Sequence, residues 1–192
     1  SMGSAQVVVA AGDSAKNAAA LINAKTNATG VKATARTELD LTALTTSSSV
    51  SLNIVSDNAV AVNVSSATGA ANDADGLAAG IAAINDKSST TGVTAKLNDA
   101  GTGITLTNAS GNDILIENAS AAAVSVNVGA AGTAGIAIAG DDGTLAAGSV
   151  AYGTGSLTLD SDKSFGIVST VTADNTAKTG FFLNAGGNNA AQ

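Results

Sequence analysis

Two groups of acidic residues are the first candidates for chemistry in this sequence. The string Gly-Asp-Asp-Gly-Thr at 140–144 places two adjacent carboxylates between glycines, as a calcium-binding loop could. Such loops need several oxygen ligands at fixed spacing, and the string lacks the longer D-x-D-x-D-G pattern. A tight turn that uses Asp-Gly chemistry is therefore the favoured interpretation, with calcium binding as the alternative.

The second group consists of Asp73, Asp75 and Asp86, which could supply carboxylates for acid–base catalysis. Aspartates also cap the orphan amides at helix ends, and capping with solvation is the favoured role. The glycine-rich segment 129–143 could cradle a phosphate only if a helix and a lysine followed it. Neither follows, so a flexible or bulged β connection is favoured there.

The composition argues against most other catalytic chemistries. The 192 residues include no His and no Cys, which weighs against serine-, cysteine- and zinc-type catalysis. We therefore predict no catalytic residue, no metal ligand and no cofactor. The net charge of −7, with eight scattered basic residues, is a poor match for nucleic acid. The chain also lacks a basic amphipathic face and a long apolar run, so no membrane partner is expected.

Several residues are candidates for modification or docking. Exposed hydroxyl-rich stretches at 45–49 and 88–91 could accept sugars. The pair Phe181-Phe182 is expected to close a small core or to dock on a missing parent domain, with a ligand pocket as the alternative. Asn-x-Ser/Thr sequences are attributed to chance in a chain so rich in these residues, and they begin at Asn27, Asn63, Asn108 and Asn118.

The elements that would position these residues occur in two similar copies in the sequence. Segments 13–35 and 75–97 align without a gap at an offset of 62, with nine identities in 23 positions. The shared string reads I-N-x-K-x-x-x-T-G-V-x-A. Such an ordered string is harder to obtain by chance than similar composition, so it indicates duplication of a supersecondary unit. A helix must bury its apolar stripe against another element, which here would be the strand that follows it.

Each copy is typical of a helix, a stop and a strand. Asp13 and Asp75 are the predicted N-caps, and the helices are expected at about 14–27 and 75–87. Gly30 and Gly92 are expected at a chain reversal with positive φ. The predicted buried stripes have helical spacing and consist of Ala15, Ala18, Ala19 and Ile22 in the first copy, and Leu77, Ile81 and Ile84 in the second.

Alternating residues predict strands in most of the remaining chain. After each glycine the period changes to two, at 31–36 and 93–98. Hairpins are predicted for 49–55 with 59–64, for 103–108 with 113–118, and for 156–169 with a turn near Ser161–Asp162. Two further short strands are expected at 123–128 and 135–140. The predicted class is α+β: two small units, each a helix with an antiparallel sheet, strand-rich overall.

This pattern predicts a division of the chain. Residues 1–4 look like an expression scar, and residues 5–45 and 46–140 are expected to form the first and second units. Residues 141–192 are expected to form a C-terminal β-hairpin region, with folding back onto the first unit as the alternative arrangement.

The duplicated phrase resembles a motif found in the central region of bacterial flagellins, the flagellin hook IN motif. Residues 83–95, AINDKSSTTGVTA, carry the resemblance most closely, and residues 22–35 with 36–41 carry it more loosely. Residues 153–169 are similar to a strand pair of the same region. The resemblance covers about 13–117, and the motif also occurs in hook-associated and cap proteins of the flagellum.

The resemblance implies a structural function without catalysis. The central region of flagellin projects from the outside of the filament, in the extracellular space, while heptad-bearing terminal helices build the filament core. No such helices are evident here, so we expect an excised outer portion that is monomeric alone. Its partners would be other flagellin subunits, through the missing terminal domains, and antibodies or host surfaces. The alternatives are a fragment of a cap or hook-associated protein, or an adhesive glycan-binding module.

Overall fold

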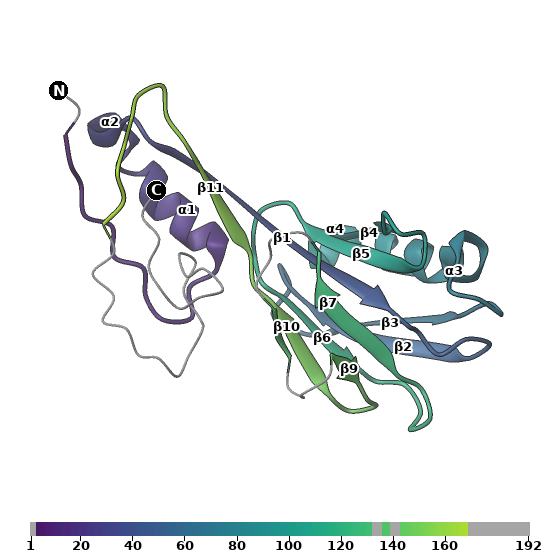
Figure 1. Ribbon diagram of the computed structural model, residues 1–192. Helices are drawn as coiled ribbons and strands as arrows, with labels where there is room; N and C mark the ends of the chain where they lie inside the picture. Colours follow the sequence, from purple (N-terminus) through teal and green to yellow (C-terminus); the bar gives the residue numbers. More distant parts are fainter. Residues whose placement is uncertain (1–2, 132–135, 139–142, 169–192) are drawn as a thin grey trace.

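Two antiparallel sheets pack face to face in the computed structural model, which describes residues 3–131, 136–138 and 143–168 (Figure 1). The predicted strand-rich α+β class is confirmed. The first sheet has the order β4 (Val93–Leu97), β5 (Gly103–Asn108), β1 (Lys32–Thr42), β7 (Val126–Ala130) and β9 (Thr144–Leu145), and β11 (Ser156–Asp160) also pairs with β1. The second sheet has the order β3 (Val62–Ala67), β2 (Ser49–Val55), β6 (Ile114–Asn118), β10 (Val150–Gly153) and β8 (Ile136–Ile138).

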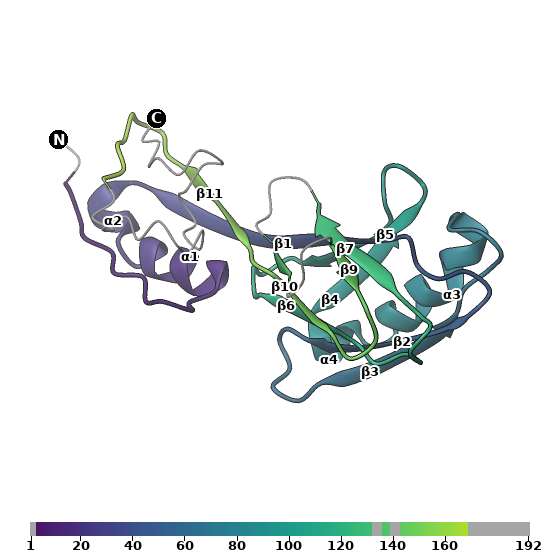
Figure 2. The ribbon, with the colours of Figure 1, turned by 60° about the horizontal axis from the view of Figure 1, so that its bottom comes forward.

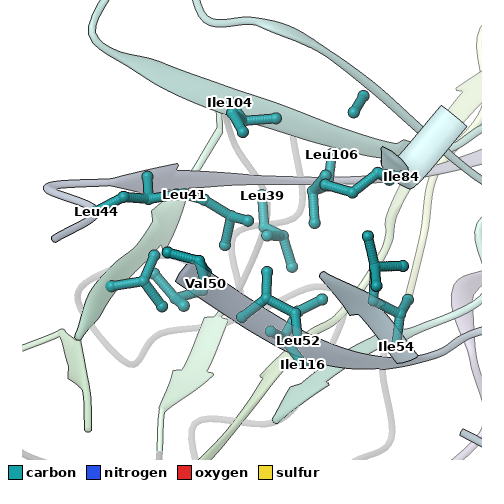
Figure 3. Packing of buried hydrophobic residues seen from close by; sticks show 14 of the residues in the cluster. Leu39, Leu41, Leu44, Val50, Leu52, Ile54, Ile84, Ile104, Leu106 and Ile116 are labelled. Carbon is teal, nitrogen blue, oxygen red and sulfur yellow. The ribbon is translucent and has the colours of Figure 1, made fainter. Parts of the chain in front are cut away.

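Aliphatic side chains from both sheets fill the space between them. Leu39 and Leu41 of β1 face Leu52 and Ile54 of β2 across the core, and Leu106 of β5 lies beside them (Figure 3). All the described members of this cluster are Leu, Ile, Val or Ala, as the scarcity of aromatic residues suggests. Alternation of buried and outward residues along β2 and along Thr37–Thr42 of β1 places one face of each segment toward this core.

The long helix of the second unit closes one side of the sandwich. The helical residues are α1 (Ala15–Asn23), α2 (Thr26–Thr29), α3 (Ala74–Asn85) and α4 (Ser88–Thr91). Helix α3 packs against β4 and β3, which are edge strands of different sheets (Figure 2). Its Leu77 and Ile84 are buried in the aliphatic core, and Ile81 packs at the margin.

A separate helix lobe, residues 3–36 and 156–168, lies at one end of the molecule and contains the first copy of the repeat together with β11 (Figure 1). Strand β1 belongs to both parts: Lys32–Arg36 pair with β11, and Thr37–Thr42 pair with β5, with β7 also pairing at 39–42. Helix α1 packs on β1 and β11. Its buried residues are Ala15, Ala18 and Ala19, none of which joins the aliphatic cluster of the sandwich. The helix lobe therefore has its own small, alanine-based core.

Two of the predicted hairpins are wrong. Strands β5 and β6 do not pair, because the loop between them carries the chain from the first sheet to the second. A glycine-bearing turn reverses the chain, but tertiary packing decides which sheet receives the next strand. The segment 156–169 contains one strand, β11; residues 161–168 are not strand, and residue 169 lies outside the described residues. Strand β3 pairs with β2 as predicted, although it begins at Val62.

The different burial of the two repeated isoleucines gives a stability prediction. Ile84 is 2% exposed in the sandwich core, whereas Ile22 in the helix lobe is only partly buried. We expect Ile84→Ala to lower the free energy of unfolding by at least about 2 kcal/mol. Ile22→Ala should lower it by less than about 2 kcal/mol, because less apolar surface returns to water. Urea unfolding of both variants checks this, and equal losses would contradict the assigned burial.

Candidate functional site

The most specific feature of the sequence, the repeated string, builds the same hydrogen-bonded joint in both units. In the second unit, Asn85 Nδ2 donates to the carbonyl oxygen of Ala95 at 2.9 Å, and Asn85 Oδ1 accepts from the Ala95 amide at 2.8 Å. In the first unit, Asn23 makes the same pair of bonds with Ala33, both at 2.8 Å. We call this arrangement the asparagine clamp. It ties the end of the helix to the third residue of the segment Val-x-Ala.

A threonine and a glycine complete each joint. Thr91 Oγ1 donates to the carbonyl oxygen of Lys87 at 3.1 Å and accepts from the Val93 amide at 3.2 Å. The hydroxyl of Thr29 makes the equivalent bonds at 3.0 and 3.2 Å. The glycine that follows is left-handed in both units, with φ of 71° at Gly30 and 70° at Gly92. The prediction of positive φ is therefore confirmed at both positions.

The clamp explains most of the repeated letters. The isoleucine packs under the helix, and the asparagine bonds the alanine of the strand. The threonine hydroxyl bridges the end of the short helix and the valine amide, and the glycine reverses the chain. The valine and the alanine are buried. Our sequence reasoning missed the roles of Asn23, Asn85, Thr29 and Thr91. Their identity in both copies was the available signal. The repeated lysine side chain is exposed in both units, and nothing in the structure explains it.

The predicted N-caps are wrong by one and two residues. Ser14 caps α1, with its Oγ accepting from the Asn17 amide at 3.3 Å, and Asp13 instead accepts from the Ala10 amide at 2.9 Å. Asp73 caps α3 by accepting from the Gly76 amide at 2.8 Å, and Asp75 lies in the first turn. The two helices end at equivalent positions but start at different ones, because only their C-terminal ends are fixed by the clamp.

A polar junction centred on Asp57 connects the second clamp to the helix lobe. The Asp57 amide donates to the carbonyl oxygen of Thr91 at 2.9 Å. Its carboxylate Oδ1 accepts from Asn108 Nδ2 at 2.8 Å and from Asn112 Nδ2 at 2.6 Å. Asn112 Oδ1 in turn accepts from Ser14 Oγ at 3.4 Å, at the start of α1. These residues are distant in sequence, so no local pattern predicts the junction.

The pKa values of two aspartates near this junction are shifted in opposite directions. Partial burial raises the pKa of Asp57, but the donated hydrogen bonds from Asn112 and Asn108 and the nearby charge of Lys16 outweigh it, so the pKa is lowered overall. Burial raises the pKa of Asp113 above its ordinary value, although the Gly155 amide donates to its carboxylate. Asp113 Oδ1 is buried without a hydrogen-bond partner. The environment of the junction therefore lowers the pKa of Asp57 and raises that of Asp113.

The structure separates the candidate acid–base residues. Asp73 and Asp75 lie at the N-terminal end of α3, whereas Asp86 follows its C-terminal end. Twelve helical residues lie between Asp73 and Asp86, a separation of roughly 18 Å along the axis. In the described part of the chain, no three His, Cys, Asp or Glu residues lie close enough to hold a metal ion. The two aspartates of the string 140–144, most of segment 129–143 and Phe181-Phe182 lie outside the described residues.

The candidate sugar acceptors differ in accessibility. Asn118 is 0% exposed and its Nδ2 donates to the carbonyl oxygens of Val124 and Leu145. Asn108 is equally enclosed, whereas Asn27 and Asn63 are exposed. Within 88–91, Thr91 is buried in the clamp, so that part of the predicted exposed stretch is wrong. The exposed residues of the two hydroxyl-rich stretches are Thr46, Ser47, Ser49, Ser89 and Thr90.

A small, partly open space of about 20 Å³ lies at the sandwich core beneath α3. Its walls are almost entirely aliphatic, with Ser66 as the one polar side chain lining it. This volume is about that of a single water, so the space is a packing defect and not a ligand pocket.

Comparison with models of known protein families finds no match, and comparison with curated proteins finds no significant relative. No helix in the described ranges has both the length and the apolar character needed to cross a bilayer.

The close approach of Gly92 to Asp57 gives a second prediction. A Cβ added at Gly92 would collide with the Asp57 carboxylate, whereas one added at Gly101, where φ is 72°, would meet open space. Gly101→Ala should lower the free energy of unfolding by ~1–2 kcal/mol, the cost of a left-handed alanine. Gly92→Ala should lower the free energy of unfolding by a further ~1–3 kcal/mol beyond the Gly101→Ala loss, because Asp57 must move and its hydrogen bonds are lost. Urea unfolding measures both, and equal losses would contradict the proposed contact.

The shifted pKa of Asp113 predicts a pH-dependent gain on mutation. Because its pKa is raised on folding, the unfolded chain loses the Asp113 proton first, and stability falls as pH rises above the ordinary value of 3.8. Asp113→Asn should therefore be more stable than the parent protein at pH 7, and the gain should disappear below pH 3.8.

Asp57→Asn is the matched control for that measurement. The pKa of Asp57 is lowered on folding, so its stabilising contribution is present above 3.8 and is lost as pH falls through the folded value. Asp57→Asn should be less stable than the parent at pH 7. Urea unfolding at both pH values checks the pair, and a loss at pH 7 for Asp113→Asn would refute the assignment.

Proposed function

We propose that this protein is a structural component of the bacterial flagellum, an outer domain of flagellin that projects from the filament surface without catalytic activity. The repeated string that resembles the flagellin motif supports this function. In both units its polar side chains bond to the chain's own backbone, as expected of residues that maintain a fold.

The paired strands of the helix lobe that lead into and out of the sandwich, which we call the stem, are the observation that carries the proposal. The chain enters the sandwich through β1 and leaves it through β11, and these strands pair antiparallel over Lys32–Arg36 and Ser156–Asp160 (Figure 1). An outer domain inserted into a longer chain needs both connections on one side. A paired two-stranded stem places both connections on one side, and it would hold the sandwich away from the filament core.

The junction around Gly155 supports a stem of defined direction. Added Cβ atoms at Gly111 and Gly155 would overlap Ala35 and Ala15 respectively, so four chain segments approach closely there. The Lys16 amide also donates to the carbonyl oxygen of Gly111 at 3.0 Å. Close packing of this kind resists bending between the lobes, which suits a domain that must keep its position on a rotating filament.

Immunogold electron microscopy of flagellated source cells tests this function. Antibodies raised against the purified protein should label the whole length of the filament, because each subunit would present one copy of the domain. Adsorption of the antibodies with the protein should abolish the label. Label only at the filament tip would instead indicate a cap protein, and label only at the hook junction a hook-associated protein.

Label on the cell body with bare filaments would reject all three flagellar assignments. An adhesive module would then remain, and a glycan array would test it.

A further inference from the structure

Two neighbouring backbone segments connect the helix lobe to the sandwich. Strand β1 changes partner between Arg36, the last residue paired with β11, and Thr37, the first residue paired with β5. The returning chain leaves β10 after Gly153 and enters β11 at Ser156, opposite Arg36. Figures 1 and 2 show these two segments, which we call the crossings, between the helices of the lobe and the two sheets. Two adjacent segments can bend together as a hinge, so further contacts must fix the orientation of the lobe.

The loop between β5 and β6, residues 109–113, makes contacts with the helix lobe beside the crossings. The Gly111 carbonyl oxygen accepts from the Lys16 amide at 3.0 Å. Asn112 Oδ1 accepts from Ser14 Oγ at 3.4 Å. Both contacts lie at the start of α1, and the loop itself continues directly into β6 of the sandwich. We call this loop the latch, because it ties α1 to the sandwich next to the hinge.

Two buried polar atoms at the crossings have no hydrogen-bond partner. Asp113, the last residue of the latch, accepts a hydrogen bond from the Gly155 amide, but its Oδ1 is buried and unpaired. Thr37 is 0% exposed, and its Oγ1 is also unpaired. Both residues lie beside Gly155, where an added Cβ would be 2.6 Å from Thr37 Oγ1. Because buried polar atoms without partners are costly, both atoms would gain hydrogen bonds if water entered between the lobes.

The charged groups around the latch do not compensate for a charge on Asp113. Besides Asp113, the charged side chains on α1, β1, β6, β11 and the loops beside them are Asp13, Lys16, Lys32, Arg36, Glu38, Asp40, Asp57, Glu117 and Asp160. Arg36 pairs with Glu38, and Lys16 lowers the pKa of Asp57. Burial raises the pKa of Asp113, and the opposing effect comes from a backbone amide and from none of these charges. An ionised Asp113 is therefore poorly accommodated while the lobes are in contact.

We propose that the latch is sensitive to protons: it holds the helix lobe most tightly when Asp113 is protonated, and ionisation of Asp113 favours a state in which the lobes part at the crossings. Water then reaches Asp113 Oδ1 and Thr37 Oγ1. Both lobes stay folded, because their cores are separate. The hydrogen bonds at Gly111 and Asn112 remain available, so ionisation loosens the lobe and does not release it.

The direction of the effect follows from linkage. The pKa of Asp113 is raised while the lobes are in contact, so the closed state is fully favoured below the ordinary value of 3.8 and loses this advantage as pH rises through the raised value. The ratio of open to closed molecules should rise about tenfold for each pH unit between the Asp113 midpoints of the two states. The pKa of Asp57 is lowered, so Asp57 stays ionised throughout this range. The device goes beyond the proposed function and does not depend on it.

Residual dipolar couplings measured by NMR test the latch, because they report the orientation of each lobe separately. The ¹³C shift of the Asp113 carboxyl group follows its ionisation in the same samples. We expect the two lobes to share one alignment at about pH 4 and to diverge toward about pH 8, with the same midpoint as the Asp113 titration. The chain has no His and no Cys, so few other side chains ionise in the upper part of this range.

Three variants make the comparison specific. Asp113→Asn keeps an acceptor for the Gly155 amide but cannot ionise, so its lobes should share one alignment at every pH. Thr37→Val replaces the unpaired hydroxyl with a methyl group, so water gains less on opening and the divergence should move to higher pH. Asp99→Asn removes a fully exposed carboxylate and should behave like the parent protein. Circular dichroism confirms that each variant is folded.

Two outcomes would overturn the latch: lobes that keep a single alignment while Asp113 ionises, or an equal divergence in Asp113→Asn. Neither outcome depends on the immunogold result, so failure of the latch and failure of the flagellar function are distinguishable.

Discussion

The structure depends on how a helix can be joined to the strand beside it without leaving backbone groups unpaired. A strand next to a helix presents amides and carbonyls that no neighbouring strand can reach, and buried groups of this kind must find partners. The side-chain amide of asparagine can direct one of its N–H donors and its carbonyl oxygen to the same side, so that it bonds both the carbonyl and the amide of one strand residue, as a neighbouring strand would. Asn85 therefore replaces a strand at Ala95, and Asn23 does so at Ala33, with almost the same distances.

The same joint supports two different amounts of packing. Around α3, the clamp holds leucine and isoleucine against a sandwich of two sheets, and that helix becomes part of the main core. Around α1, it holds alanines against the two-stranded stem of β1 and β11. Two strands alone are marginal in water, so α1 and the close approaches at Gly111 and Gly155 must supply the remaining support. The continuous strand β1 then connects the weaker unit to the stronger one.

Part of the local structure was predictable from the sequence, and long-range contacts were not. The glycine reversals and the strand at 49–55 depend on neighbouring residues and occur where the pattern predicts them. The predicted N-caps Asp13 and Asp75 were nevertheless displaced, because neighbouring polar residues could cap equally well. The β5–β6 hairpin failed because a turn does not specify the sheet of the next strand. The Asp57 junction joins residues more than 50 positions apart, and such a contact has no local signature. The asparagine clamp was predictable in part. The repeat identified its asparagines as important, but it did not show which strand residues they bond.

Duplication also separates what the fold requires from what it permits. Positions that form the clamp are the same in both copies because a change in any one would leave a backbone group unpaired or force a left-handed residue other than glycine. Outward positions on the helices carry no such constraint, and at two of them the copies differ in charge: Lys16 stands where the second copy has Ala78, and Asp86 where the first has Ala24. Two helices of one chain can thereby present different surfaces to solvent without any change in the clamps that join them to their strands.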